Sequence, residues 1–480
     1  MTRPERQVYL LDPKHLSPET IAVTFAKTSR SPQRFAEIAA DLTDEKSAEF
    51  HEKWVVGYGH ASVAEHAILH IAVENISRLA VESLESCRLA SYTEKSTRYQ
   101  KWSDEVYHLP EELNNHPLNN LYESTIQELF AAYQQALPQV KALIQQQIPA
   151  REGESEIAWE RRVRSRYVDV CRFYLPAAAL ANVGVTINAR ALEHLISKML
   201  SHPLAEVRQT GEALKSVGQA CAPTLIKYAN PIPYLENAQQ QLQNLSKVLP
   251  PNMQNQDWCN LVSWQANSEN RVLAAALYRE AGLGYAHCLE WVESASPADR
   301  SQLTSIILDN LEKFTIPLRE LEYATFTFDL ILDQGAYFEL KRHRMMTQTP
   351  QPLNTLLGYA MPRAIVLAGL EDHFRAAMNS AHRAFQRLAE WNPGIAAYVV
   401  PNAFNRRVLL EMNLRSADHL LALRSADNAH FSVRRVVQRM AEQLRAALPL
   451  FAPYLRCNPH ETWQGIQAEY FAATNLRADD

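Results

Sequence analysis

The stretch from Ala64 to Tyr99 reads AEHAILHIAVENISRLAVESLESCRLASYTEKSTRY. Its first part alternates, so that Leu69, Ile71 and Val73 share one face, which is the period of a half-buried strand. The apolar spacing then becomes helical, and a polar loop with two arginines follows. The helical stripe consists of Ile76, Leu79, Ala80, Leu84 and Cys87. The stretch therefore predicts a strand, a helix and an arginine-bearing loop in that order.

A second stretch, from Leu321 to Asn354, repeats this order: LEYATFTFDLILDQGAYFELKRHRMMTQTPQPLN. Its strand face consists of Phe326, Phe328, Leu330 and Leu332, and its helical stripe of Ala336, Tyr337 and Leu340. A repeat of this kind is considered before local secondary-structure patterns, because it determines the architecture of the whole chain.

Two further stretches match downstream, Phe173–Met199 and Tyr398–Arg424. The interval from proline to asparagine is the same in both, and each stretch ends in a predicted helix with Asn-x-Arg near its start. The matching residues are Pro176, Asn188 and Arg190 in the first copy and Pro401, Asn413 and Arg415 in the second. Two landmarks in the same order predict a tandem duplication.

We therefore predict an α+β fold of two tandem domains, each a mixed or antiparallel sheet packed with long helices, and helix-rich overall. The predicted boundaries are 1–235 for the first domain, 236–262 for a linker and 263–480 for the second domain. Within the linker region, Glu236 to Asp257 is interpreted as a helix that runs into a polar connection. Leu109 to Arg166 is predicted as long amphipathic helix, and Ser296 as an N-cap followed by proline.

Composition excludes several classes of protein. The 480 residues are 47% hydrophobic, and Lys+Arg 48 against Asp+Glu 53 argues against a nucleic-acid binder, although a local basic pocket remains open. The six cysteines contain no Cys-x-x-Cys pair, so no metal site is predicted. The first residues lack the apolar core of a signal peptide, and no apolar run is long enough to cross a bilayer. We expect a soluble cytoplasmic protein without a membrane partner.

Two basic segments are candidates for chemistry. Arg342–His343–Arg344 could be a solvated cluster on the negative end of a helix, or a clamp for phosphate or flavin. The loop Arg88–Tyr99 joins hydroxyls, a carboxylate and two arginines, which suits phosphate and a ribose hydroxyl or base N–H, but also suits an ordinary polar turn. Isolated histidines and the helix-end cysteine are interpreted as structural; they are His66, His70, His194 and Cys87.

Taken together, these segments resemble the flavin-dependent thymidylate synthase (ThyX) family, whose signature is Arg-His-Arg-x-x-Ser-x-x-x-x-Ser-x-Arg. The first copy, SCRLASYTEKSTR, keeps Arg88, Ser91, Ser96 and Arg98 and has Ser86-Cys87 for the leading pair. The second copy, RHRMMTQTPQPLN, keeps Arg342, His343 and Arg344, has Thr347 for the first serine, and has Pro352 and Asn354 where the last two signature residues would be.

The resemblance extends beyond the signature, over roughly residues 20–225 and 265–450. GHASVAEH at Gly59–His66 resembles the family segment before the core strand, of which the second copy keeps Glu322. NLRSADHLLALR resembles the family's Asn-x-Arg helix and includes Arg424, where the first copy has Met199. Conversely, the arginine four residues before the family's proline is Arg172 in the first copy and Ala397 in the second.

The resemblance implies an enzyme that methylates dUMP, or a related pyrimidine nucleotide, in dTMP biosynthesis. FAD would be the cofactor, with NADPH and methylenetetrahydrofolate as co-substrates. Carried over by position, the nucleotide-binding residues are Glu94, Ser96, Arg98, Arg172 and Arg424, with Arg98 and Arg424 as the catalytic pair. The FAD-binding residues are His60, Ser62, Arg88, Ser91, Asn188, Arg190, Arg342, His343, Arg344, Asn413 and Arg415.

The two copies have lost complementary residues, and the family's sites are built from several subunits. We therefore expect a homodimer that forms a pseudo-tetramer, in which one complete site is assembled from both copies. Random decay would give a similar pattern. The carboxylates of Glu82 and Glu339, on the helices before the signature, would repel phosphate or uracil. A different pyrimidine remains open for that reason, as does a catalytically inactive protein that binds nucleotide or flavin or only oligomerises.

Overall fold

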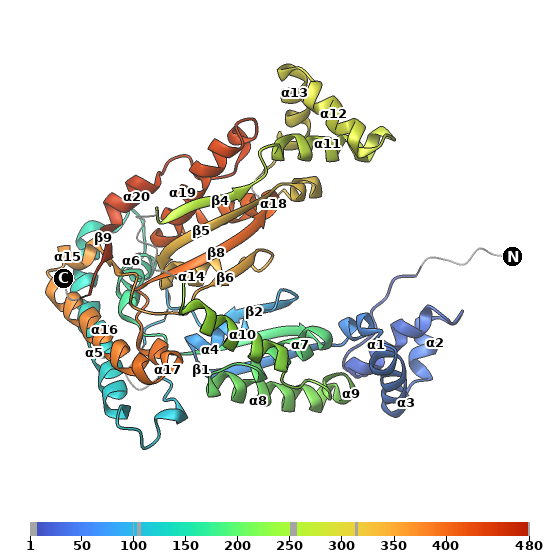
Figure 1. The fold of residues 1–480 in the computed structure, drawn as a ribbon, viewed down its shortest axis with the longest axis horizontal. Helices are drawn as coiled ribbons and strands as arrows, with labels where there is room; N and C mark the ends of the chain where they lie inside the picture. Colours follow the sequence, from blue (N-terminus) through green and yellow to red (C-terminus); the bar gives the residue numbers. More distant parts are fainter. Residues whose placement is uncertain (1–6, 99, 103–106, 250–256, 313–314, 479–480) are drawn as a thin grey trace. The chain divides into compact units, whose positions relative to one another are not determined.

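The computed structural model of the protein describes residues 7–98, 100–102, 107–249, 257–312 and 315–478 (Figure 1). Its contacts divide the chain into two compact units that alternate along the sequence. The described residues within 1–95, 106–117 and 178–252 form the first unit, and those within 96–105, 118–177 and 253–480 form the second. The second unit therefore contains segments of both repeats. The domain boundaries predicted at 235 and 263 mark the repeats and stay a prediction; linker residues 250–256 and Tyr99 lie outside the described residues.

The first unit contains an antiparallel sheet in the order β1-β3-β2. Its strands are β1 Ile68–Ser77, β2 Ala90–Glu94 and β3 Leu180–Asn188. Two predictions are corrected here. Ile76, expected in the helical stripe, lies in β1, because the strand continues to Ser77, whose hydroxyl caps the next helix at Ala80. Part of the segment expected as an arginine-bearing loop, Ala90–Glu94, forms β2, because its backbone pairs with β3.

Short helices surround this sheet. They are α1 Pro18–Thr28, α2 Phe35–Ala40, α3 Asp44–Phe50, α4 Arg78–Leu84, α7 Ala189–Leu200, α8 Ala205–Cys221, α9 Pro223–Ile226 and α10 Pro233–Ser246, with a π-helical turn η1 at His51–Gly57 and 3₁₀ turns η2 at Ala61–His66 and η3 at Glu111–Leu113. Helix α10 covers the start of the predicted linker, as expected from its sequence, and buries none of its residues.

The second unit contains an antiparallel sheet in the order β4-β5-β8-β6 and a two-stranded sheet β7-β9. The strands are β4 Cys259–Trp264, β5 Thr325–Asp333, β6 Thr347–Pro350, β7 Tyr359–Pro362, β8 Asn405–Asn413 and β9 Phe471–Leu476. The alternation predicted for β5 is confirmed, because Phe326, Phe328, Leu330 and Leu332 are all buried.

The helices of the second unit include two from the first repeat. They are α5 Asn119–Gln147, α6 Glu156–Cys171, α11 Ser268–Ala281, α12 Tyr285–Ser294, α13 Pro297–Leu308, α14 Gln334–Leu340, α15 Arg363–Leu367, α16 Glu371–Trp391, α17 Pro393–Ala396, α18 Leu414–Arg424, α19 Phe431–Ala447 and α20 Trp463–Tyr470, with 3₁₀ turns η4 Arg172–Tyr174, η5 Arg319–Tyr323, η6 Ala397–Val399 and η7 Ala452–Tyr454. The long helix predicted from Leu109 to Arg166 is two helices, because proline and glycine between Ile148 and Ser155 interrupt it. The N-cap predicted at Ser296 is confirmed.

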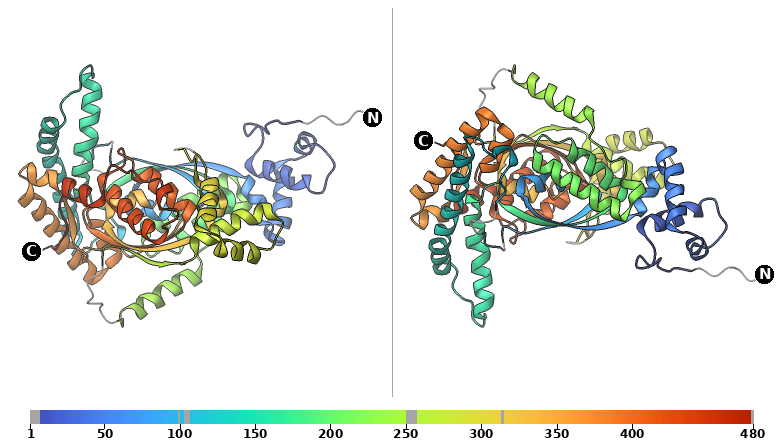
Figure 2. Two further views of the ribbon diagram at one scale, coloured as in Figure 1. Left: turned by 90° about the horizontal axis from the view of Figure 1, so that it is seen from above. Right: turned by 90° about the horizontal axis from the view of Figure 1, so that it is seen from below.

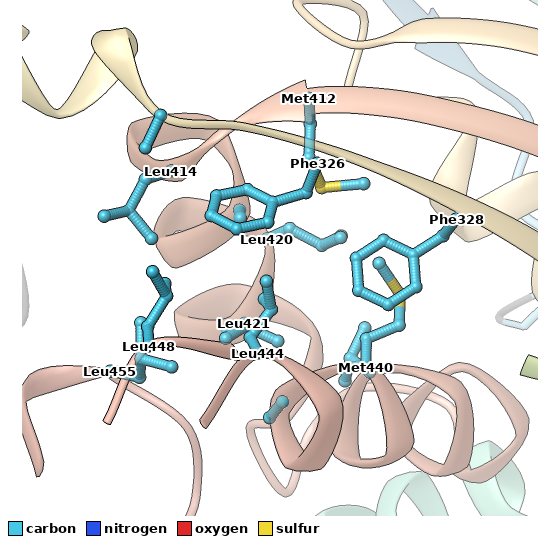
Figure 3. Packing of buried hydrophobic residues seen from close by; sticks show 14 of the residues in the cluster. Phe326, Phe328, Met412, Leu414, Leu420, Leu421, Met440, Leu444, Leu448 and Leu455 are labelled. Carbon is cyan, nitrogen blue, oxygen red and sulfur yellow. The ribbon is translucent and has the colours of Figure 1, made fainter. Parts of the chain in front are cut away.

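The core of the second unit lies between one face of its larger sheet and helices α18 and α19 (Figure 3). Phe326 and Phe328 of β5 point from the sheet toward Leu420 and Leu421 of α18. Leu444 and Met440 of α19 close the same cluster. Burying a side chain of this size contributes roughly 1.5–3 kcal/mol, so the cluster fixes β5, and with it the start of α14.

Equivalent segments of the two repeats meet inside the second unit. Helix α5 of the first repeat packs against α16 of the second, and the two lie side by side in both views of Figure 2. Pro176 and Pro401, which occupy matching positions, form an antiparallel bridge. A residue that pairs with its own counterpart implies a local two-fold relation between the repeats. No helix among the described residues has the length and apolar character needed to cross a bilayer.

Candidate functional site

Three helices of the second unit place an arginine–carboxylate cluster. Asp333 is the N-cap of α14, and its carboxylate accepts a hydrogen bond from the amide of Ala336. Glu339 is the sixth residue of this helix. Helix α18 ends at Arg424. From the first repeat, α6 ends next to Arg172. Residues of both repeats therefore contribute to one cluster.

Glu339 is the centre of the cluster. Its Oε2 accepts a hydrogen bond from Nη1 of Arg424 at 2.8 Å, and its Oε1 lies 3.7 Å from Nη1 of Arg172. The side chains of Glu339 and Arg172 are only 5% and 2% exposed. Arg172 also donates from Nη2 to the carbonyl of Gly335 at 3.1 Å. A carboxylate this deeply buried is stable only with such charged partners.

Arg98 joins the cluster through a second carboxylate. Its Nε and Nη2 donate to the two oxygens of Asp169, both at 2.8 Å, and its Nη1 donates to the carbonyl of Asn428 at 3.1 Å. This parallel pair of hydrogen bonds is the strongest geometry available to arginine, and it fixes the guanidinium plane. Ser96 accepts from the amide of Arg98 and so orders the same turn.

The pKa of Glu339 is shifted by the combined positive charge of the cluster. Burial alone raises this pKa, but the nearby charges of Arg172, Arg342, Arg424 and Arg98 outweigh burial, and the net shift is downward. The carboxylate is therefore ionised. The four guanidinium groups outnumber the nearby carboxylates, which are Glu339, Asp169 and Asp333.

His343 is held as a neutral acceptor. Burial, followed by the charge of Arg424, lowers the pKa of His343 to about 3. Its Nε2 accepts a hydrogen bond from Nε of Arg424 at 2.9 Å, and the ring of His419 meets it edge-on. The imidazole thus helps Glu339 to fix the orientation of Arg424.

Three buried polar residues, Asp333, Ser432 and His430, lie next to the cluster and stabilise it. Asp333 accepts from the hydroxyl of Ser432, and burial raises the pKa of this carboxyl. His430 is fully buried beside Arg172 and Arg98, and burial holds its pKa well below its usual value. Its Nε2 lies 3.2 Å from the carbonyl of Asp169. These contacts fix the helix ends from which the arginines extend.

The other residues predicted in the second unit lie near this cluster or on α18. Arg342 is exposed and contributes to the field at Glu339 and Arg424, and Arg344 is half-buried after α14. Asn413 caps α18 through Oδ1, and Arg415 donates to Glu322 at 2.7 Å.

The residues predicted in the first unit have different surroundings. Glu94 pairs with Arg78 at 2.9 Å, with side chains 3% and 2% exposed. Asn188 caps α7, and Arg190 pairs with Glu65. The remaining four lie at or near the surface; they are His60, Ser62, Arg88 and Ser91.

Two supporting residues were missed by the sequence interpretation, Asp169 and His430. Asp169 lies three residues before Arg172, so that both leave the same end of α6, and this spacing was a usable signal. Glu339 was noted only as a repulsive group, whereas the structure makes it the shared partner of two arginines. No cluster of His, Cys, Asp or Glu that could hold a metal occurs within the described part of the chain.

The family model described as thymidylate synthase complementing protein matches residues 12–224 and 260–450. The chain belongs to this family. The two matched segments agree with a tandem duplication of its fold. A UPF0159 protein of Chlamydia muridarum is 30% identical over 444 residues, covering 87% of this chain and 83% of the relative. A flavin-dependent thymidylate synthase of Clostridium tetani is 28% identical over 216 residues, covering 45% of this chain and 83% of the relative.

Similar solved structures include ThyX of Helicobacter pylori complexed with FAD and dUMP, at 18% identity. The match covers 42% of this chain and 90% of that chain, with a TM-score of 0.29.

Proposed function

We propose that the protein is a flavin-dependent thymidylate synthase-like enzyme with one composite nucleotide site per chain. The observation that carries this proposal is the meeting of Arg98 and Arg172, from the first repeat, with Arg424, from the second, around the carboxylate of Glu339. The substrate class is a pyrimidine nucleoside monophosphate, dUMP or a close relative.

The charge of the cluster suits such a ligand. A phosphate monoester carries about −1.5 to −2 charges near pH 7, and the arginines of the cluster outnumber its carboxylates. The sequence supports a single site, because the positions that match Arg98, Arg172 and Arg424 in the other repeat are Asn354, Ala397 and Met199. A second site that took each of these positions from the other repeat would lack all three arginines.

The residues assigned to FAD fit it in part. The pyrophosphate of a dinucleotide needs cations. Arg342 would supply one, whereas Arg415 already pairs with Glu322. The caps of α7 and α18 use the amide oxygens of Asn188 and Asn413, so only their Nδ2 donors remain for a ligand. A bound reduced flavin would supply the reducing equivalents for the methyl transfer. NADPH as reductant and methylenetetrahydrofolate as carbon donor follow from the family resemblance.

The chain's own residues would bind and orient the nucleotide. Arg98 would hold the phosphate, and the buried Arg172 would add its positive charge; both are already fixed by internal contacts, so little ordering is needed on binding. Arg424, fixed by Glu339 and His343, would place a positive charge where negative charge develops on the pyrimidine ring. A homodimer acting as a pseudo-tetramer would complete the assembly.

One observation favours the alternative of a catalytically inactive member. Asp169 already occupies two donors of Arg98, and Glu339 is shared by Arg172 and Arg424. These carboxylates could replace a ligand altogether.

The test is the absorbance spectrum of the purified protein, followed by growth rescue of a thymidine-requiring host. A flavin spectrum and rescue support the enzyme. A protein that stays colourless after incubation with FAD and fails to rescue growth supports the inactive alternative.

A further inference from the structure

Helix α10 of the first unit, Pro233–Ser246, is amphipathic but buries none of its residues. A helix of about 12–15 residues is only marginally stable in water without packing against an apolar partner. The apolar side chains of α10 and of the turn that follows it are exposed to solvent. They are Tyr234 (75% exposed), Leu242 (66%), Leu245 (62%), Val248 (75%) and Leu249 (68%).

The polar face of α10, and not its apolar face, is turned toward the rest of the first unit. A hollow of about 370 Å³ lies between α10 and the turn that joins α7 to α8. At about 100° per residue, Leu242 and Leu245 lie on the opposite side of the helix from this hollow. A surface helix that packs on its own domain has the reverse arrangement, with the apolar stripe inward. The residues of α10 that line the hollow are all polar; they are Glu236, Gln239, Gln240 and Gln243.

The exposed apolar stripe has the spacing of a coiled coil. Its residues stand at alternating intervals of three and four along the sequence, which is the pattern by which one helix inserts its side chains between those of a partner helix. The chemistry of the stripe therefore fits another helix with the same spacing. The residues are Leu235, Ala238, Leu242 and Leu245, and Leu249 continues the pattern.

The positions that flank this stripe determine which helix can pair with it. Charged residues at such positions select the partner of a coiled coil, and like charges oppose pairing with a second copy. In α10 they are the uncharged Gln239, Gln241 and Ser246, so nothing opposes self-pairing. Helices that bind anionic membranes carry lysine and arginine on the polar face. Helix α10 contains neither, so a lipid surface is a poorer fit than a second copy.

The exposed area is sufficient for a weak interface between two copies. Burying an apolar side chain of this size removes roughly 100 Å² of surface. The exposed side chains named above, taken from two copies, would together bury on the order of 1,000 Å². Stable interfaces bury about 1,200–2,000 Å². The contact is therefore expected to form reversibly and to depend on protein concentration.

We propose that α10 pairs with the α10 of a second copy of this chain. The helix lies outside the two segments that match the family model, residues 12–224 and 260–450, so the contact is not part of the shared fold. The pairing involves neither the arginine–carboxylate cluster nor a nucleotide, and it does not rest on the proposed function.

The experiment is sedimentation velocity of the full chain over a range of concentrations. The double variant Leu242→Glu/Leu245→Glu places charges inside the contact and should weaken association at least a hundredfold. The matched control, Gln240→Glu/Gln243→Glu, adds the same charges at the same spacing on the polar face, and should associate like the unmodified protein. Urea denaturation at a concentration where the chains are separate should give both variants the same free energy of unfolding, because the substituted leucines are exposed.

Four outcomes overturn the proposal. One is an unmodified protein that stays monomeric up to about 100 µM, and another is association that the leucine variant leaves unchanged. A leucine variant that unfolds more easily than its control as separate chains would show that its own chain covers the apolar face. Binding to phosphatidylserine vesicles that only the leucine variant loses would assign the face to a membrane. Failure of the proposed nucleotide methylation leaves all four measurements interpretable, because none of them involves the cluster.

Discussion

Replacing Glu339 by glutamine removes one negative charge from the centre of the arginine–carboxylate cluster and keeps the shape of the side chain. At an effective dielectric constant near 20, a charge at 2.8 Å interacts by roughly 6 kcal/mol and one at 3.7 Å by roughly 4.5 kcal/mol. Desolvation of the buried groups offsets much of this. Breaking a buried ion pair typically costs about 3–5 kcal/mol. Because glutamine still accepts a hydrogen bond, we expect Glu339→Gln to lower the free energy of unfolding by about 3 kcal/mol at pH 7.

The effect should depend on pH in a defined direction. The pKa of Glu339 is lower in the folded protein than in the unfolded chain, so its contribution is complete above the unfolded value and is lost as pH falls through the folded value. The difference between wild type and Glu339→Gln should therefore be constant from pH 7 to about pH 5 and shrink below about pH 4.

Urea denaturation of the full chain at several pH values measures this difference. The control is Glu390→Gln, which breaks a surface pair with Arg387 whose side chains are 65% and 64% exposed. This control should change stability by less than about 1 kcal/mol. If Glu339→Gln is as stable as its control at pH 7, the account of a charge-stabilised cluster is wrong.

Three further substitutions test the fold and the cluster by urea denaturation. Arg98→Lys keeps the charge but loses the paired hydrogen bonds to Asp169, and should destabilise by about 1–2 kcal/mol; no change would show that this pair is not formed in solution. Gly358→Ala should destabilise by more than about 1 kcal/mol, because φ is +72° and a Cβ would lie 2.7 Å from the carbonyl of Leu476; a neutral result would contradict this backbone conformation. Phe328→Ala should cost about 3–5 kcal/mol through the cavity it leaves, and a loss below about 1 kcal/mol would contradict its place in the core.

The duplication and the main strands could be predicted from the sequence because period-two alternation depends on only a few neighbouring residues. Phe326 and Phe328 alternate with polar residues and are buried as expected. The helix boundaries were harder to predict from the sequence. Ile76 fits both a strand and a helical stripe, and only pairing with β3 assigns it to the strand.

The partners of the arginines could not be predicted, because they depend on contacts between distant segments. Arg98 and Asp169 are separated by 71 residues, and Arg424 and Glu339 by 85. A local pattern carries no information about such pairs. Asp169 was therefore overlooked, and Glu339 was interpreted as an obstacle to anion binding although it orients two of the cations.

We propose that both repeats build one nucleotide site. Calorimetric titration of dUMP measures it most directly, with Arg98→Gln from the first repeat, Arg424→Gln from the second and the surface variant Arg387→Gln as control, each checked for folding by circular dichroism. We predict one dUMP per chain for the unmodified protein and the control, and at least tenfold weaker binding in both cluster variants. Two nucleotides per chain, or binding that depends on only one of the two arginines, would contradict a shared site.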